Sequence, residues 1–401
     1  DEIRSTDSLY ELGFDTENVW EYKEDEYAIR FIEEKWFQKI EYEESDEVIV
    51  IKNAKEIELI KEVGERTWKF FEHTMTDLNN YLPPDNYQEN RRPKIVNRTS
   101  STNIGYGVLA IINAYDLEFI PVEEAVNRLY NTLKTVEKLE KWNGHLYNWY
   151  NIKTLEPLKP RFVSTVDSGN FVACIYVTIP LLKKLAASKI VMEKLSDKIL
   201  ELQRICNELV SGVDFNKLYV KSKNIFSIGF DVEANKCVDS YYDMLMSESR
   251  LTSLIAISTS QITSKHWFAL ARQLVKVGNL KGLISWSGTS FEYFMPNLFT
   301  KTHKYTLIDE ALSFALNSQI DYAKSAGVPW GVSESAFAVQ DNEQHYQYKA
   351  FGIPWLGLKR GLNDNMVISP YSSLICLQYA PRKVVNNIKH FRKYNAYSNY
   401  G

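Results

Sequence analysis

Two glutamates lie in segments where a carboxylate is unusual. Glu334 is in GVPWGVSESAF, an apolar stretch with serines as its other polar side chains. We expect Ser333 and Ser335 to donate hydrogen bonds to it. A carboxylate that accepts such bonds keeps a low pKa and stays ionised, which suits a nucleophile or a base. The alternative is that Glu334 caps a helix.

Glu248 is the second candidate, in YYDMLMSESRLTSLIAIS. Helical periodicity places it on one stripe with Met244 and Ile255, which would face the core. An ionised carboxylate is costly there, so we expect its pKa to rise, which suits a general acid. A structural ion pair with Arg250 is the alternative. If Glu248 faces Glu334, one could protonate a glycosidic oxygen while the other attacks carbon or activates water.

Two further acids lie at predicted helix starts. TSFE, which ends at Glu292, fits a capping box, and STVD, which ends at Asp167, has the same form with an aspartate. Each acid could therefore cap its own helix or reach a ligand.

Aromatic residues supply the remaining binding candidates. The chain has 9 Trp, 25 Tyr and 19 Phe, and aromatic faces pack cores or stack on the C–H faces of sugar rings. Trp286 in SWSGTS and Trp330 in VPWG are predicted in loops, and Tyr348 in HYQYKAFG is a weaker candidate. The predicted substrate-binding residues are Asp167, Arg250, Trp286, Glu292, Trp330 and Tyr348.

Composition argues against several other functions. The six His and four Cys are scattered, without a C-x-x-C pair, so we expect free thiols in a reducing compartment and no zinc. Residues 1–50 carry a net charge of −12 and the remainder +8. Without a supporting motif, this charge is weak evidence for nucleic acid. Phosphate-loop, dinucleotide and G-x-S-x-G motifs are missing. No apolar run of about 18 residues occurs in the sequence, so we expect no membrane insertion.

Helices must position these candidates, because helical periodicity dominates from Glu56 onward. About a dozen helices joined by loops predict an all-α (α/α)6 barrel, with an open helical array as the competing architecture. We expect residues 56–401 to form the catalytic domain and 1–55 an acidic appendage or linker. That appendage would hold a helix at 27–40 and, at 47–52, a short strand or an entry segment. The other predicted helices span 56–76, 103–116, 121–139, 168–187, 191–210, 241–258, 264–276, 290–296, 305–325, 343–350, 370–379 and 382–394.

Several of these stretches belong to a series of long sequence blocks that runs from about Glu56 to the C-terminus and resembles one known family. They include RTSSTNIGYGVLA, RFVSTVDSGNF, DSYYDMLMSESRLTSLIAI, LISWSGTSFEYFMPNL, GVPWGVSESAF and YQYKAFGIPWLGLKRGL. Together they resemble the middle domain of cyclic β-1,2-glucan synthases. The resemblance implies an (α/α)6 barrel related to endo-β-1,2-glucanases, with no metal or organic cofactor. It also implies that Glu248 is the acid/base and Glu334 the nucleophile.

The activity implied by the resemblance is ring closure of linear β-1,2-glucan by anomer-retaining transglycosylation. Related synthases also carry a membrane-embedded glycosyltransferase region and a phosphorylase-like region. The implied partners are therefore the glucan and the other domains of a larger synthase polypeptide. The implied location is cytoplasmic, within an enzyme anchored in the inner membrane. An endo-β-1,2-glucanase and a non-catalytic glucan-binding module are the alternative functions.

Overall fold

The computed structural model describes residues 51, 53–89, 94–278, 280–340, 346–394 and 396–401. The acidic segment 1–50, with its predicted helix at 27–40, lies outside the described residues. Most of the strand predicted at 47–52 also lies outside them.

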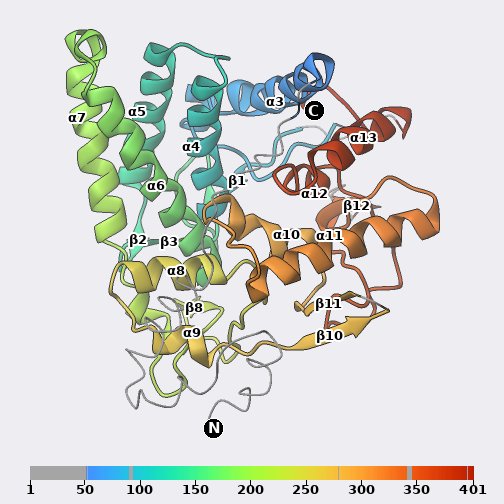
Figure 1. Ribbon diagram of the computed structural model, residues 1–401. Coiled ribbons are helices and arrows are strands. Elements are labelled where there is room, and N and C mark those ends of the chain that lie inside the picture. The colour runs from blue at the N-terminus through green and yellow to red at the C-terminus, as the bar shows by residue number, and fades with distance from the viewer. Residues whose placement is uncertain (1–50, 52, 90–93, 279, 341–345, 395) are drawn as a thin grey trace.

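The described chain is built mainly from helices, which form an (α/α)6 barrel (Figure 1). The helices are α3 (Ala54–Thr74), α4 (Ser101–Asp116), α5 (Val122–Lys138), α6 (Thr165–Ala186), α7 (Lys189–Ser211), α8 (Arg250–Ser258), α9 (Lys265–Ala269), α10 (Ser290–Phe294), α11 (Leu307–Ala326), α12 (Tyr371–Leu374) and α13 (Pro381–Phe391).

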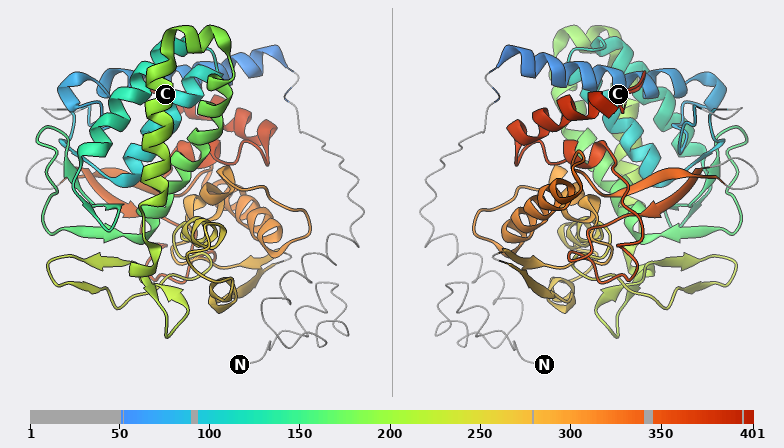
Figure 2. Two further views of the ribbon diagram at one scale, coloured as in Figure 1. Left: turned by 90° about the vertical axis from the view of Figure 1, so that its left-hand side faces the viewer. Right: turned by 90° about the vertical axis from the view of Figure 1, so that its right-hand side faces the viewer.

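Helices α4, α6, α8, α10 and α12 make the inner layer, in which α4 packs on α6, α6 on α8, and α10 on α12. Outer helices pack against them, and α13 meets α3 where the described chain returns to its start (Figure 2).

Short antiparallel strands occupy the connections between helices. The longest pair joins β12 (Glu334–Gln340) to β13 (Tyr346–Ala350), with Glu334 opposite Ala350. The other strands are β1 (Arg98–Thr99) with β4 (Tyr150–Asn151), β2 (Lys141–Trp142) with β3 (His145–Leu146), β5 (Phe162–Ser164) with β8 (Gly229–Asp231) and β9 (Lys236–Cys237), β6 (Tyr219–Val220) with β7 (Ile225–Phe226), and β10 (Leu274–Val277) with β11 (Leu280–Leu283).

Four predicted helices are wrong in part. Residues 346–350 of the predicted helix 343–350 form strand β13, because YQYKA pairs with β12 and tyrosine favours strands. The helix predicted over 264–276 ends at Ala269, and LVKV then pairs with β11. The helix predicted over 370–379 stops at Leu374 and continues as turns. The fourth, over 241–258, begins only at Arg250.

Buried apolar side chains form two large clusters and one small one. The first fills the space among α3–α7 and includes Ile104 and Leu129. The second lies among α10–α13 and includes Tyr293 and Phe314. The small cluster joins the inner layer, because its buried members come from α6, from α8 and from the short 3₁₀ helix that follows α10 (Ala173, Leu251 and Met295).

Within the described residues, α6 is the one helix long and apolar enough by composition to cross a membrane. Polar residues interrupt its sequence, so it contains no uninterrupted apolar run of about 18 residues. In addition, 67% of its most apolar window is buried inside the fold, as expected of a core helix.

Inner helices α6 and α8 approach each other very closely at Gly169. A Cβ atom there would lie 2.7 Å from the Thr252 Cα and 2.0 Å from its hydroxyl oxygen. The absence of a side chain at this position therefore sets the spacing between the two helices that carry much of the candidate site.

We expect Gly169→Ala to lower the free energy of unfolding by about 1–3 kcal/mol, because the added methyl group forces the two helices apart. Gly64→Ala is the matched control in α3, where a Cβ would meet Phe119 at an ordinary 3.5 Å. There the same substitution should stabilise the helix by about 0.5–1 kcal/mol. Urea denaturation measures both values. Equal effects of the two substitutions would contradict the close approach.

Candidate active site

The N-terminal ends of the inner helices bring the polar candidates together. Asp167 lies in the first turn of α6 and Glu292 in the first turn of α10, while Glu248 directly precedes the N-cap of α8. Unpaired N–H groups and the helix dipole make this end of a helix favourable for negative charge. The barrel therefore offers one end where carboxylates can be held.

Glu248 lies in a loop and not on the predicted helical stripe. Ser247 has a left-handed backbone with φ of 53°, which interrupts a helix before α8. The side chain is nevertheless buried, with Glu248 only 6% exposed. Asn170 donates a 2.6 Å hydrogen bond to Oε1, and the Ser247 hydroxyl donates to Oε2.

The predicted rise of the Glu248 pKa is confirmed. Burial, together with the charges of Glu334 and Asp167, raises the pKa of this carboxyl to about 7. Hydrogen bonds from Ser247 and Asn170 oppose the rise but do not cancel it. Glu248 is therefore poised to hold a proton near neutral pH.

Arg250 does not form the alternative ion pair with Glu248. Its buried guanidinium donates to the carbonyl oxygens of Glu292 and Tyr293 and to Asn297 Oδ1. These contacts tie α8 to α10, so the structure places Arg250 in the scaffold and away from the position expected of a substrate ligand.

Asp167 is connected to Glu248 through a chain of side chains. Its Oδ1 accepts a 2.6 Å hydrogen bond from the Thr102 hydroxyl, and its Oδ2 accepts a 2.9 Å bond from Asn148. The Asn170 amide that holds Glu248 also lies 3.1 Å from the Thr102 hydroxyl oxygen. The helix cap is provided by the Ser164 hydroxyl, which accepts from the Asp167 N–H. The Asp167 carboxylate is thus directed to the site and not to capping.

Glu292 has the structural role that its capping box allowed. It is 1% exposed, and with Thr289 it forms the complete capping box at the start of α10. Its carboxylate also accepts from the Ser285 and Ser287 hydroxyls and from the Ser247 N–H. Glu292 therefore fixes the loop that carries Glu248 and has no face left for a ligand.

Glu334 begins strand β12 and is half-buried. The Tyr348 hydroxyl, from the paired strand β13, donates a 2.7 Å hydrogen bond to its Oε2. The predicted donors have other partners. Ser335 donates to the Ala336 carbonyl, and the Ser333 hydroxyl oxygen accepts from the Phe291 N–H.

The expected low pKa of Glu334 is wrong. Burial raises the pKa of this carboxyl, and the Tyr348 hydrogen bond lowers it only in part. Tyr348 is 66% exposed as a residue, whereas its hydroxyl lies against Glu334. Loss of water around that hydroxyl, together with the Glu334 charge, raises the pKa of Tyr348. Tyr348 is thus placed to orient Glu334.

Side-chain amides hold the segment before Glu334 in an extended shape. Asn387 of α13 binds both the N–H and the carbonyl of Trp330, at 3.0 and 2.6 Å. Gln319 of α11 binds both groups of Val332, at 2.7 and 2.8 Å. Trp330 is consequently 8% exposed and packed in the core. The prediction that it is a sugar platform is wrong.

Trp286 is accessible as predicted for a platform, since it is 45% exposed. It lines a pocket of about 190 Å³ together with Asp243, Arg272 and Gln273. The loop that leads to Glu248 forms another wall of this pocket through Met246. The pocket offers an aromatic face beside polar groups, which is an arrangement suited to a sugar ring.

Three tyrosines near the carboxylates were not predicted. Burial and the Glu248 charge raise the pKa of Tyr106, Tyr242 and Tyr371. The Tyr371 hydroxyl lies 2.9 Å from the Glu334 carbonyl oxygen. In a chain with so many tyrosines, residue type alone gives no signal for these positions. Within the described residues, no group of three or more His, Cys, Asp or Glu could hold a metal ion.

We expect Glu248→Gln to change how stability depends on pH. The folded protein keeps the Glu248 proton up to about pH 7, whereas an unfolded glutamate releases it near 4.5. Wild-type protein therefore loses stability relative to Glu248→Gln as pH rises through this window, by about 3 kcal/mol in total. Urea denaturation across the window measures the difference.

Glu201→Gln provides a control of opposite sign. The hydrogen bond from Arg204 lowers the pKa of Glu201 to about 2. Its stabilising effect should be present above pH 4.5 and disappear on acidification. A difference between wild type and Glu248→Gln that stays constant with pH would contradict the raised pKa of Glu248.

Comparison with known proteins identifies structures and sequences that are similar to this chain. The Glycoamylase family model, described as “Putative glucoamylase”, matches residues 240–401. A protein of the same description from Bacteroides caccae has a solved structure with a TM-score of 0.69 and 17% identity, covering 86% of each chain. The endo-β-1,2-glucanase of Chitinophaga pinensis has a TM-score of 0.67 and 17% identity, covering 86% of this chain and 85% of that one. These similarities establish the fold.

Sequence similarity is stronger to a much longer protein. The cyclic β-(1,2)-glucan synthase NdvB of Rhizobium meliloti is 30% identical over 481 aligned positions. The alignment covers 91% of this chain and 17% of that relative, so the chain spans about one sixth of the relative's length. The chain is thus related in sequence to one region of the cyclic β-1,2-glucan synthases, and it shares its (α/α)6 fold with the endo-β-1,2-glucanases.

Proposed function

We propose that this protein is an anomer-retaining transglycosylase that closes linear β-1,2-glucan into rings. The observation that carries the proposal is the contrast between two neighbouring carboxyls. Glu248 is buried with a pKa near 7, and Glu334 is half-buried with one oxygen held by Tyr348. An acid that keeps its proton beside an oriented carboxylate is the arrangement that glycoside chemistry requires.

In the first step, an oxygen of Glu334 attacks the anomeric carbon of a bound glucan. The bond between this carbon and the glycosidic oxygen breaks, and Glu248 gives its proton to the departing oxygen. Tyr348 donates to the other Glu334 oxygen, which orients the carboxylate for attack. The products are a glycosyl ester on Glu334 and a free chain end.

In the second step, a sugar 2-hydroxyl attacks the same carbon. Glu248, now ionised, takes the hydroxyl proton, and the bond to Glu334 breaks. When the hydroxyl belongs to the non-reducing end of the attached chain, the product is a ring. An acceptor on the same chain has a high effective concentration and can compete with water.

The name of the relative in Rhizobium meliloti supports this substrate, as does the Chitinophaga pinensis glucanase, which was solved with sophorotriose and glucose. Because the chain spans 17% of that relative, we further infer that it works as one region of a longer polypeptide. In this view residues 56–401 form the catalytic domain and 1–55 an acidic appendage. The whole would lie on the cytoplasmic side of the inner membrane.

We expect Glu248→Gln and Glu334→Gln each to lower ring formation from linear β-1,2-glucan by about 10³-fold, because each removes an essential proton donor or nucleophile. Mass spectrometry identifies rings as products lighter than linear chains by one water. Glu208→Gln, on the exposed surface of α7, is the control and should keep full activity.

The alternative functions give different products. Linear fragments alone would indicate an endo-β-1,2-glucanase. In that case Asp167, which is held beside Glu248, is a candidate for activating water, and Asp167→Asn should abolish hydrolysis. Glucan binding without turnover, unchanged in both glutamine variants, would indicate a binding module.

The pH dependence of kcat/KM should be bell-shaped, because the reaction needs Glu334 ionised and Glu248 protonated. The alkaline limb should lie near pH 7, and the acid limb should lie above 4.5, since the pKa of Glu334 is raised from that value. Ser247→Ala removes a donor that lowers the pKa of Glu248, so the alkaline limb should move up by about half to one pH unit.

Ser258→Ala is the control for this shift, since the exposed Ser258 hydroxyl donates to the Ile255 carbonyl within its own helix. A downward shift in Ser247→Ala, or an equal shift in both variants, would contradict the assigned role of Glu248.

A further inference from the structure

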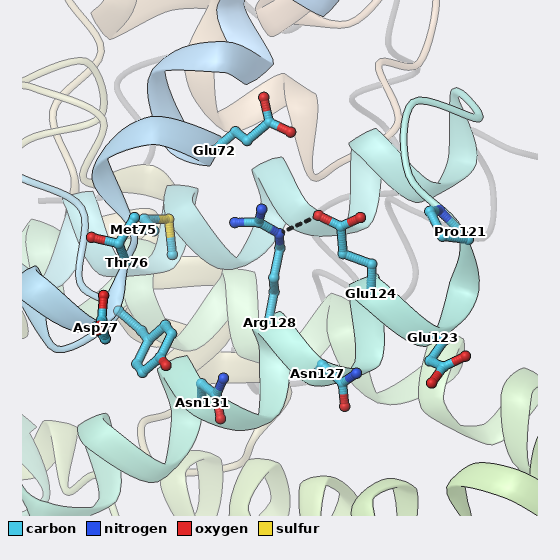
Figure 3. A pocket seen from close by; sticks show the side chains of 11 residues that line it. Glu72, Met75, Thr76, Asp77, Pro121, Glu123, Glu124, Asn127, Arg128 and Asn131 are labelled. Carbon is cyan, nitrogen blue, oxygen red and sulfur yellow. Dashed lines mark hydrogen bonds and ion pairs between the residues drawn. The ribbon is translucent and has the colours of Figure 1, made fainter.

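A second large pocket lies apart from the candidate active site. It has a volume of about 520 Å³ and is formed by the C-terminal end of α3, the turns after it, and α5 (Figure 3). Neither Glu248 nor Glu334 lines it, and no residue of the hydrogen-bond chain around Glu248 does so. The mechanism proposed above makes no use of it.

Arg128 lies at the centre of this pocket. Its Nε donates a 2.8 Å hydrogen bond to Glu124, and its guanidinium lies 5.3 Å from the centre of the Trp68 ring. These two contacts fix the plane of the group. Figure 3 shows the guanidinium between Glu72 on one side and Asn127 and Asn131 on the other. Its two terminal nitrogens have no hydrogen-bond partner among the described residues.

The neighbouring side chains offer both donors and acceptors. Asn127 uses its oxygen to accept a 2.6 Å bond from Lys198, which leaves its N–H groups to donate. Within the described part of the chain, the Asn131 side chain has no hydrogen-bond partner. Glu72 and Asp77 add carboxylate acceptors at the rim. A sugar hydroxyl both donates and accepts, so it can pair with each kind of group.

The charges in the pocket oppose an anionic ligand, because its lining carries four carboxylates, from Glu72, Asp77, Glu123 and Glu124, and one guanidinium, from Arg128. Within the described residues, no group of three or more His, Cys, Asp or Glu could hold a metal ion. A polyol satisfies the free hydrogen-bonding groups, while Tyr81 and Met75 supply an apolar wall.

We propose that this pocket is a second glucan-binding site, which holds a distant part of the chain that is processed at Glu248 and Glu334. The identity of the glucan rests on the proposed function. Binding one chain at two places makes the second contact intramolecular, which strengthens binding without any new contact at the active site. Long glucans should therefore bind more tightly than short ones that reach only one site.

The test uses calorimetric binding of linear β-1,2-glucan, long or short, to protein carrying Glu334→Gln. Asn131→Ala or Arg128→Gln added to this background should weaken binding of the long glucan about tenfold or more and leave the short glucan unchanged. In otherwise wild-type protein, the same changes should raise KM for long chains without changing kcat. Asn207→Ala, an exposed amide on α7, is the control.

Asn131→Ala carries the test if loss of the Trp68 contact makes Arg128→Gln unstable. Unchanged affinity for long glucan in Asn131→Ala would overturn the second site, and so would affinity that does not depend on chain length. Ring formation by the wild-type protein is scored separately. If the wild-type protein forms rings but the pocket substitutions do not weaken binding of long glucan more than of short glucan, the proposed function stands and only the second binding site is rejected.

Discussion

A carboxylate buried without a cation is the constraint on which this end of the barrel depends. None of the ion pairs among the described residues includes Glu248, and the nearby Arg250 is turned toward the carbonyls of α10. An unpaired charge in such a place is expensive, so the group retains a proton near neutral pH. When Glu248 ionises, its buried charge costs free energy. The fold must hold Asn170, Ser247 and the helix N-termini in positions where they reduce this cost.

The number of hydrogen-bond donors around a buried glutamate distinguishes a structural carboxylate from a candidate proton donor. Glu292 is as buried as Glu248, yet its two oxygens are met by the hydroxyls of Ser285 and Ser287 and by backbone N–H groups. Such a carboxylate is already solvated by the protein and fixes the surrounding loop. Glu248 accepts hydrogen bonds from one amide and one hydroxyl, so its ionised form is less stabilised and the carboxyl can keep and give up a proton. In the structure each of the two residues stands near a helix start, although the sequence predicted Glu248 in the interior of a helix.

Sequence reasoning found what depends on local pattern and missed what depends on distant pairing. The capping box of Glu292 and most helices were predictable, because propensity and periodicity act over a few residues. The burial of Glu248 was predicted from a helical stripe, although Ser247 interrupts that helix and the burial comes from the barrel end. The Tyr348 contact to Glu334 and the Asn387 contact to Trp330 arise from strand pairing and from an outer helix. No spacing within one segment predicts either contact.

The amide contacts from α11 and α13 also determine how the Glu334 segment moves. A surface loop opens locally at little cost, whereas this segment has its backbone groups bound by Gln319 and Asn387 on two packed helices. Its local opening therefore requires displacement of the outer layer, so it shares the cooperative unfolding unit of those helices. Glu334 begins strand β12 directly after this segment, so it gains the rigidity of the outer layer although residues 328–333 lie in no helix or strand.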